Sequence, residues 1–212
     1  MICVSLGNIN FEQALDIAKD SEMVEIRADL LNFSDSEYRE LISSSAKTVF
    51  TCRKSDAFSL DRRSLFALAL KMNVDYIDLE IESVEELMEW LKAETNEKDT
   101  ELIISYHNYE NTPSSEELMR IFKQCFKFGA DVAKIACMAN SDEDVVNLIK
   151  MYRKQGRKIV LGMGEKGMLT RVAAPVLGAE FTFASANKES TTAPGQLSVK
   201  EMKDLFEIMK IQ

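Results

Sequence analysis

The sequence alternates eight times between a short apolar run and a longer stretch of helical periodicity, and this alternation constrains the fold more than any other feature. Most of the apolar runs are almost continuous, as expected for strands that are covered on both faces. Strands are predicted at Ile2–Ser5, Met23–Arg27, Lys47–Thr51, Tyr76–Leu79, Leu102–Tyr106, Val132–Ala136, Lys158–Gly162 and Phe181–Ala184. Eight such runs separated by helices predict parallel strands joined by right-handed crossovers.

Helix signals fill the intervals between these runs. Ser34 followed by Glu37 is a capping box, and Gly156 is expected to end the sixth helix as its C′ residue. Pro175 interrupts the seventh helical stretch, so the pattern is weakest there. Helices are predicted at Asn10–Lys19, Ser34–Ile42, Asp61–Met72, Ser83–Ala93, Ser115–Phe128, Ser141–Gln155, Leu169–Leu177 and Val199–Lys210.

Two α/β architectures fit eight strand–helix units, namely a closed (β/α)8 TIM barrel and a doubly wound open sheet. The count of eight favours the barrel, although 212 residues is near the lower length limit of that fold. We therefore expect a single catalytic (β/α)8-barrel domain over residues 1–212.

Composition argues against several classes of function. The net charge is −9 and the chain has no basic stripe, so nucleic-acid binding is not expected. No apolar run could span a bilayer, and Met1–Leu6 lacks signal-peptide features, so a cytoplasmic location without membrane attachment is expected. One histidine and no C-x-x-C pair argue against a metal site. The cysteines are interpreted as small core residues: Cys3, Cys52, Cys125 and Cys137.

The most anomalous residue is Lys134, in the middle of the apolar run Val132–Ala136. Barrel active sites form at the carboxyl ends of the strands, which makes a lysine on the sixth strand a candidate. A lysine that snorkels from an edge strand is the commoner case in general. Here the apolar neighbours favour a functional role, because a desolvated amine near other cations is neutral and attacks a ketone or aldehyde.

His107 is the only histidine, and it follows the fifth apolar run, one strand before Lys134. A lone histidine is more often structural than catalytic. Its place at a strand end, with Asn108 and Tyr109 beside it, instead favours a general acid and base. A nucleophilic amine beside such a group suggests a Schiff-base lyase or an aldolase.

Three arginines lie at strand ends or in loops of the expected active face: Arg27, Arg53 and Arg171. Each alone would be read as a surface residue. Together with Thr192 and Gln196 they predict a site for a carboxylated, polyhydroxylated substrate, because arginine binds carboxylates through two donors.

The segment Gly162–Gly167 matches the dinucleotide pattern G-x-G-x-x-G. A dinucleotide site uses the first strand–helix turn of its domain, whereas this segment belongs to the seventh unit. Nicotinamide binding is therefore not expected.

Six segments in chain order resemble the type I 3-dehydroquinate dehydratase family: Glu25–Asp29, Thr51–Arg53, Ser105–Asn108 with Thr112-Pro113, Ala133–Ala136, Met163-Gly164 with Gly167 and Thr170-Arg171, and Ala193–Gln196. The resemblance implies a TIM barrel that converts 3-dehydroquinate to 3-dehydroshikimate in aromatic amino-acid biosynthesis. It implies an imine on Lys134 and proton transfer by His107. It also implies a homodimer that needs no cofactor.

The resemblance assigns further residues to the substrate. Arg171, Gln196 and Thr192 are expected to hold its carboxylate and hydroxyls, with Met163 also in the binding site. Glu25, Arg27 and Arg53 are expected to line the hydroxyl-binding side.

The sequence departs from the family pattern beside the histidine. The glutamate that usually pairs with it is missing, and Asp56 is expected to take its place. Asn108 stands where an aspartate is usual, and Thr192 where a serine is usual.

Two other functions stay open from the sequence. A class I aldolase or transaldolase would use the same lysine on phosphorylated sugars, with Gly162–Gly164 as a phosphate loop. An inactive barrel kept as a binding module is the other. The loop Ser185–Gln196 is read either as an active-site lid or as an ordered connection.

Overall fold

The computed structural model describes residues 1–54, 61–95 and 99–211. Its parallel strands are β1 (Ile2–Leu6), β2 (Val24–Arg27), β3 (Thr48–Thr51), β4 (Tyr76–Glu80), β5 (Glu101–Asn108), β6 (Val132–Met138), β7 (Lys158–Met163) and β8 (Thr182–Ser185). The hydrogen-bonded order is β7-β6-β5-β4-β3-β2-β1-β8, so the last strand returns beside the first. The chain is therefore a (β/α)8 barrel, as the alternation predicts, and not a doubly wound sheet.

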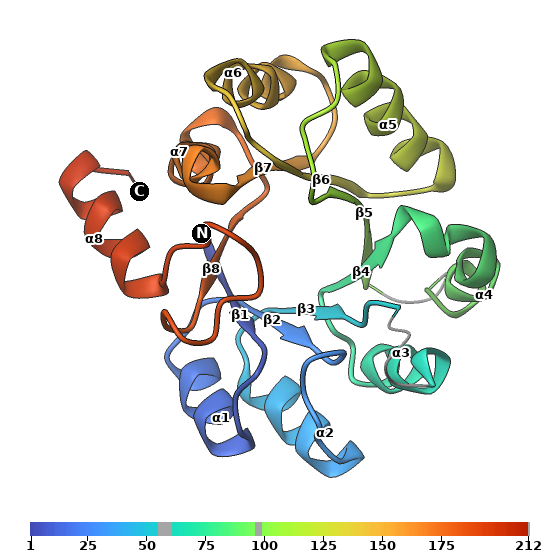
Figure 1. Cartoon of the computed structure of the whole chain (residues 1–212). Helices are drawn as coiled ribbons and strands as arrows, with labels where there is room; N and C mark the ends of the chain where they lie inside the picture. Colours follow the sequence, from blue (N-terminus) through green and yellow to red (C-terminus); the bar gives the residue numbers. More distant parts are fainter. Residues whose placement is uncertain (55–60, 96–98, 212) are drawn as a thin grey trace.

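Helices surround the strands in a ring (Figure 1). They are α1 (Phe11–Lys19), α2 (Asp35–Ser44), α3 (Arg62–Lys71), α4 (Val84–Thr95), α5 (Ser115–Phe128), α6 (Asp142–Lys150), α7 (Gly164–Leu177) and α8 (Val199–Met209), with the 3-10 turns η1 (Ile81–Ser83) and η2 (Met151–Arg153). The capping box predicted at Ser34 is confirmed, because the Ser34 side chain accepts a hydrogen bond from Glu37 N. None of the described helices is long and apolar enough to cross a membrane.

The barrel closes between β7 and β8, the two ends of the strand order. A backbone hydrogen bond from Glu180 N to Lys158 O spans this gap at 2.9 Å. At the same end of the barrel, the Arg157 guanidinium binds Glu101 of β5 and Glu180, the latter at 2.6 Å from Nη2. A guanidinium shared by two carboxylates ties the start of β5 to both sides of the gap.

Two helix predictions are wrong. The sixth helix ends at Lys150 and not at Gln155, because the chain tightens into η2 and buries Tyr152, whose hydroxyl bonds both Val160 O and Val160 N. Gly156 is therefore not the C′ residue of α6, although its φ of +107° does require a left-handed conformation.

The seventh helix begins at Gly164, five residues before the predicted Leu169. Pro175 does not interrupt it, since it lies in the last turn before Gly178. The helical periodicity does not predict the first turns of α7, because these turns pack against β7 through small residues. A Cβ on Gly167 would lie 2.4 Å from the Gly162 carbonyl carbon, so the helix and β7 can approach this closely only with glycines.

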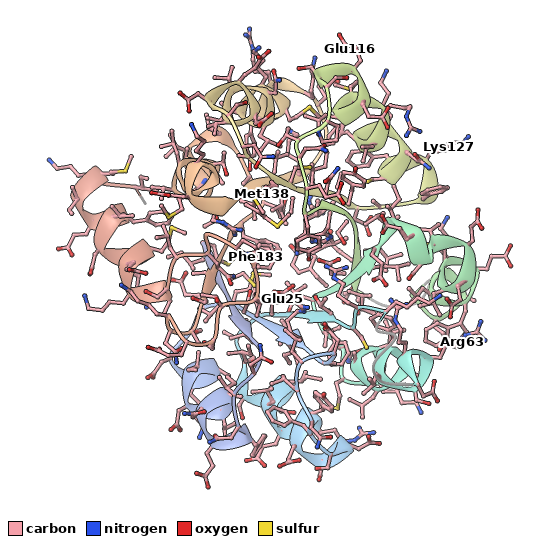
Figure 2. All side chains as sticks on the ribbon, in the orientation of Figure 1. Glu25, Arg63, Glu116, Lys127, Met138 and Phe183 are labelled. Carbon is pink, nitrogen blue, oxygen red and sulfur yellow. The ribbon has the colours of Figure 1, made fainter. Side chains whose placement is uncertain are left out.

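The interior of the barrel holds aromatic side chains as well as polar ones. Phe181 and Phe183 pack edge to face inside the barrel near the closure. The cysteines are all buried and unpaired, which confirms their interpretation as core residues. Figure 2 shows Glu25 and Phe183 near the barrel axis, while Arg63, Glu116 and Lys127 lie on the outer helices. The polar side chains near the barrel axis therefore mark where a site can form.

Candidate active site

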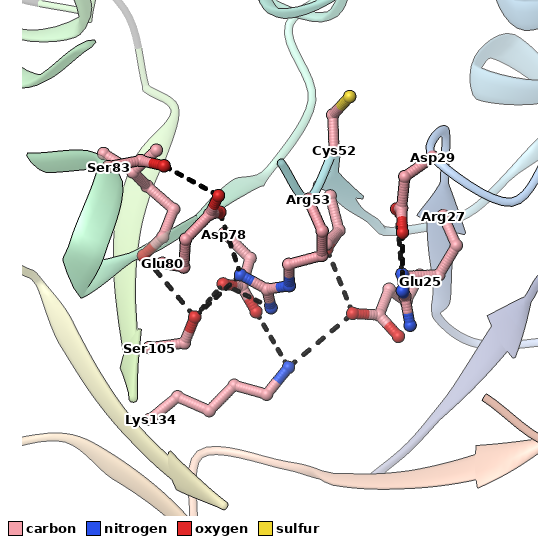
Figure 3. Close-up of polar contacts among 12 residues, drawn as sticks. Glu25, Arg27, Asp29, Cys52, Arg53, Asp78, Glu80, Ser83, Ser105 and Lys134 are labelled. Atoms are coloured by element: carbon pink, nitrogen blue, oxygen red, sulfur yellow. Dashed lines mark hydrogen bonds and ion pairs between the residues drawn. The ribbon is translucent and has the colours of Figure 1, made fainter. Parts of the chain in front are cut away.

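Polar side chains form one layer across the barrel interior, near the carboxyl ends of the strands. They come from successive strands and are buried: Ser5, Glu25, Thr51, Asp78, Ser105 and Lys134. Figure 3 shows several of them pointing toward one another. Buried polar groups are costly unless they pair, and these groups pair with each other.

Lys134 lies inside this layer and is only 5% exposed. Its Nζ is 2.8 Å from Asp78 Oδ2, 3.6 Å from Glu25 Oε1 and 3.9 Å from the centroid of the Phe183 ring. β6 pairs with β5 and β7, so the alternative of a lysine that snorkels from an edge strand is wrong. The amine is held by carboxylates and an aromatic face.

Asp78 is a candidate functional residue to which sequence reasoning gave no role. It is fully buried, and besides Lys134 it contacts Arg53 Nη2 at 2.9 Å and Ser105 Oγ at 2.6 Å through Oδ1. Burial raises the pKa of Asp78, but Arg53 and Lys134 outweigh it and hold that pKa well below its usual range. A carboxylate in the middle of the apolar run Tyr76–Leu79 was the available signal.

His107 lies in β5, two residues beyond Ser105, and is half-buried at the mouth of the barrel. Its ring stacks on Tyr109 with centroids 6.1 Å apart. Burial and the nearby cations Arg53 and Lys134 lower the pKa of His107 well below its usual value. The imidazole is therefore neutral near pH 7 and can accept a proton. Asp56, the expected partner of His107, lies outside the described residues.

The three arginines have different partners. Arg53 binds Asp78, Ser105 Oγ (2.9 Å) and, more weakly, Glu80 (3.4 Å). Arg27 forms two hydrogen bonds with Asp29, at 3.0 and 2.6 Å. These two guanidinium groups are anchored by carboxylates.

Arg171 is the exception. It is 2% exposed and has no carboxylate within ion-pair distance among the described residues, and its Nε is a buried donor that lacks a hydrogen-bond acceptor there. Burial lowers the pKa of Arg171 to about 10, so the group is still charged at neutral pH. A buried, uncompensated cation of this kind is suited to an anionic ligand.

The loop after β8 packs against the start of α7. Gly164 N donates to Pro194 O at 3.1 Å, and a Cβ on Gly195 would lie 2.3 Å from Gly164 O. The Gln196 amide accepts from Thr192 N (2.8 Å) and donates to Ser5 Oγ (3.3 Å). Gln196 thus binds this loop to the barrel interior, and both readings of the loop, as a lid or as an ordered connection, remain predictions.

Every described residue that the sequence assigns to the site lines one pocket: Glu25, Arg27, Arg53, His107, Lys134, Met163, Arg171, Thr192 and Gln196. The pocket opens at the carboxyl ends of the strands. The glycines of Gly162–Gly167 serve close packing instead, since Gly162 and Gly167 touch and Gly164 N is bonded to Pro194 O.

The fold and this pocket define a class of protein: a (β/α)8-barrel enzyme whose active face carries a buried lysine within an ionic cluster. Residues 2–212 match the family model described as "Type I 3-dehydroquinase". The chain belongs to the type I 3-dehydroquinase family.

Relatives agree with this assignment over the whole chain. A 3-dehydroquinate dehydratase of Desulfotalea psychrophila is 35% identical, with 97% of this chain and 96% of that protein covered. One from Methanocaldococcus jannaschii is 34% identical with both chains covered completely. The crystal structure of 3-dehydroquinate dehydratase from Aquifex aeolicus superposes with a TM-score of 0.83, at 32% identity and 98% coverage of each chain.

Proposed function

We propose that the chain converts 3-dehydroquinate to 3-dehydroshikimate and water through an imine on Lys134. The observation that carries this proposal is the buried Lys134 amine, 2.8 Å from Asp78, in the same pocket as His107 and the uncompensated Arg171. A nucleophilic amine, a proton-transfer group and a carboxylate-binding cation are the groups that this dehydration requires.

The imine is the first intermediate in the proposed reaction. Lys134 Nζ adds to the substrate ketone, and loss of water gives a cationic imine. Asp78 stays ionised, so it stabilises that cation, and the Phe183 ring at 3.9 Å adds an attractive aromatic face. The cationic imine withdraws electrons and acidifies the adjacent C–H bond.

His107 carries the protons in this proposal. As a neutral base it removes the proton next to the imine carbon, which leaves an enamine. It then gives a proton to the departing hydroxyl as the carbon–oxygen bond breaks. Water hydrolyses the conjugated imine and frees Lys134. The lowered pKa of His107 supports the first step, since a neutral imidazole is the required form.

Substrate recognition is assigned to the other residues that line the pocket. Arg171 supplies the cation for the substrate carboxylate, with Gln196 and Thr192 beside it as polar contacts. Glu25, Arg27 and Arg53 face the hydroxyl-bearing side, and Met163 lines the pocket. The homodimer and the place in aromatic amino-acid biosynthesis remain predictions of the resemblance, and the cytoplasmic location remains a prediction of the sequence composition.

Borohydride trapping tests the proposal directly. The protein is mixed with 3-dehydroquinate, reduced with borohydride, digested and mapped by mass spectrometry. We expect a reduced adduct on the peptide that contains Lys134, and none in Lys134→Ala. No adduct on the folded protein, together with no rise in enone absorbance, would refute the function. Carbon–carbon cleavage of sugar phosphates would favour an aldolase.

Replacing Arg171 by methionine is expected to raise KM for 3-dehydroquinate about 100-fold, because a charged hydrogen-bond pair is worth roughly 1.5–3 kcal/mol. Because the buried cation has no carboxylate partner among the described residues, its removal should raise the melting temperature or leave it unchanged. Steady-state kinetics and thermal unfolding measure both quantities. An unchanged KM would assign the carboxylate to another cation.

A further inference from the structure

Arg62 occupies a place that helix electrostatics disfavours. It is the first residue of α3, directly after the N-cap Asp61, and the first turn contains no acidic residue. A cation there faces the positive end of the helix dipole. Arg62 is nevertheless only 8% exposed, whereas the adjacent Arg63 is exposed. Its position must therefore be set by specific contacts.

The Arg62 guanidinium uses all three of its nitrogens. Nε donates to Cys52 O at 2.9 Å, Nη1 to Ser83 Oγ at 2.9 Å and Nη2 to Glu80 Oε1 at 2.7 Å. These partners lie after β3, in η1 and at the end of β4. Arg62 thus joins the ends of two neighbouring strands, and one of its partners, Cys52, directly precedes the pocket residue Arg53.

Glu80 is the carboxylate that pairs with Arg62. Its Oε1 also accepts from Ser83 Oγ at 2.7 Å and from Lys54 N at 3.0 Å, while its Oε2 lies 3.4 Å from Arg53 Nη1 (Figure 3). The carboxylate is thus bound closely on the Arg62 side and weakly on the Arg53 side. The contacts of Arg53 with Asp78 and Ser105, near Lys134, are shorter than its contact with Glu80.

Those shorter contacts lead to the lysine. Arg53 lies 2.9 Å from Asp78 Oδ1 and 2.9 Å from Ser105 Oγ, and Asp78 Oδ2 binds Lys134 at 2.8 Å. Three cations and three carboxylates therefore form one buried series: Arg62, Glu80, Arg53, Asp78, Lys134 and Glu25. Without Arg62, the 3.4 Å contact with Arg53 is the ion pair that remains to Glu80 among the described residues, and a buried charge that loses its closer partner attracts the remaining opposite charge more strongly.

We propose that Arg62 is a positioning residue for the lysine site, which it does not touch: by neutralising Glu80 it keeps the Arg53 guanidinium on Asp78 and so keeps Asp78 beside Lys134. Without Arg62, the Glu80 carboxylate draws Arg53 toward itself and Asp78 loses a partner. This inference rests on the proposed dehydratase function, since it assigns a further residue to the same site.

A double-mutant cycle between Arg62 and Glu80 tests the proposal, with Arg63→Met as the matched control. Arg62→Met should lower kcat about 30-fold and change KM less than about threefold, because the substrate carboxylate site is untouched. The kcat of Glu80→Gln should stay within about fivefold of that of the unmodified protein, because a neutral amide no longer attracts the Arg53 guanidinium. The kcat of the double variant should stay within the same range. Arg63→Met should match the original protein.

Each kcat is expressed per folded protein, with the folded fraction measured by circular dichroism, so that a smaller folded fraction is not counted as a loss of kcat. A crystal structure of Arg62→Met should show the Arg53 guanidinium moved from Asp78 to Glu80. The proposal is overturned if Arg62→Met keeps full kcat, or if Glu80→Gln fails to recover the activity that Arg62→Met loses. If Arg62→Met does not fold, the double variant tests the proposal instead. A kcat that is 30-fold or more below that of the unmodified protein in the double variant would refute the positioning role of Arg62.

The outcomes separate the two proposals. An original protein without dehydratase activity contradicts the proposed function, and the Arg53–Asp78 distance in the Arg62→Met crystal then tests the positioning by itself. An active original protein with an unaffected Arg62→Met contradicts the positioning alone.

Discussion

Replacement of Lys134 by methionine is expected to lower kcat/KM roughly 10⁴-fold or more, because loss of the proposed covalent nucleophile removes the whole proposed stepwise route. Methionine keeps most of the length of the side chain, so the packing against Phe183 changes little. Asp78 keeps Arg53 and Ser105 as partners, and the variant should therefore fold. Enone absorbance measures the rate, and circular dichroism the fold.

Lys158 offers a matched control, since it is also a buried lysine, at 6% exposure. It lies at the first residue of β7, with its Nζ 6.0 Å from the Phe122 ring, and it does not line the pocket. Lys158→Met should keep kcat/KM within about twofold, because its charge interacts with no pocket residue. Equal losses in the two variants would mean that burial of a lysine matters for folding only. Substantial activity in Lys134→Met would require a different nucleophile.

The fold could be predicted from the sequence because a buried parallel strand and an amphipathic helix differ in period and length. All eight strands lie where the apolar runs predict them, within a residue or two at each end. The start of α7 could not be predicted in this way. Its first turn holds Gly164 and Gly167, whose role is close approach to β7 and to the loop at Gly195, and such contacts leave no periodic pattern.

The residues of the candidate site also fall into two groups, those that the sequence predicts and those that it does not. Residues at strand ends, such as His107 and Arg53, were assigned because a parallel barrel brings all strand ends to one face. The roles of Asp78 and Ser105 could not be predicted, because they depend on which side chain the neighbouring strand places opposite them. Arg62 lies at the start of α3 and its partner Glu80 at the end of β4, so their pairing depends on how the helix packs against the strand ends, which no sequence period records.

These contacts also explain how a barrel interior tolerates so many charges. Lys134 and Arg53 share Asp78, while Glu80 is shared by Arg53 and Arg62, so positive and negative groups alternate. Removing one member of a buried ion pair costs about 3–5 kcal/mol, because the remaining charge then lacks the partner that offsets its desolvation. Arg171 stands outside this balance, and the proposed substrate carboxylate would complete it.

Replacement of His107 by glutamine is expected to lower kcat about 10³-fold, within the range of roughly 10²–10⁴ that proton transfer by a side chain contributes. Glutamine keeps a polar group in the pocket but cannot exchange a proton. Imine formation does not require the C–H proton transfer, so borohydride should still trap an adduct on Lys134, more slowly. Added imidazole should restore part of the rate, because it can enter the pocket mouth where His107 is half-buried.

The pH profile gives the sharper test of His107. A base acts only when unprotonated, so kcat/KM falls as pH drops through the pKa that this base has in the free protein. Burial, Arg53 and Lys134 lower the pKa of His107, so this fall should lie below about pH 6.5, the ordinary value for histidine. In His107→Gln the residual rate should lose that acid limb. An acid limb that persists unchanged in the variant would assign the proton transfer to another group and leave His107 with a structural role.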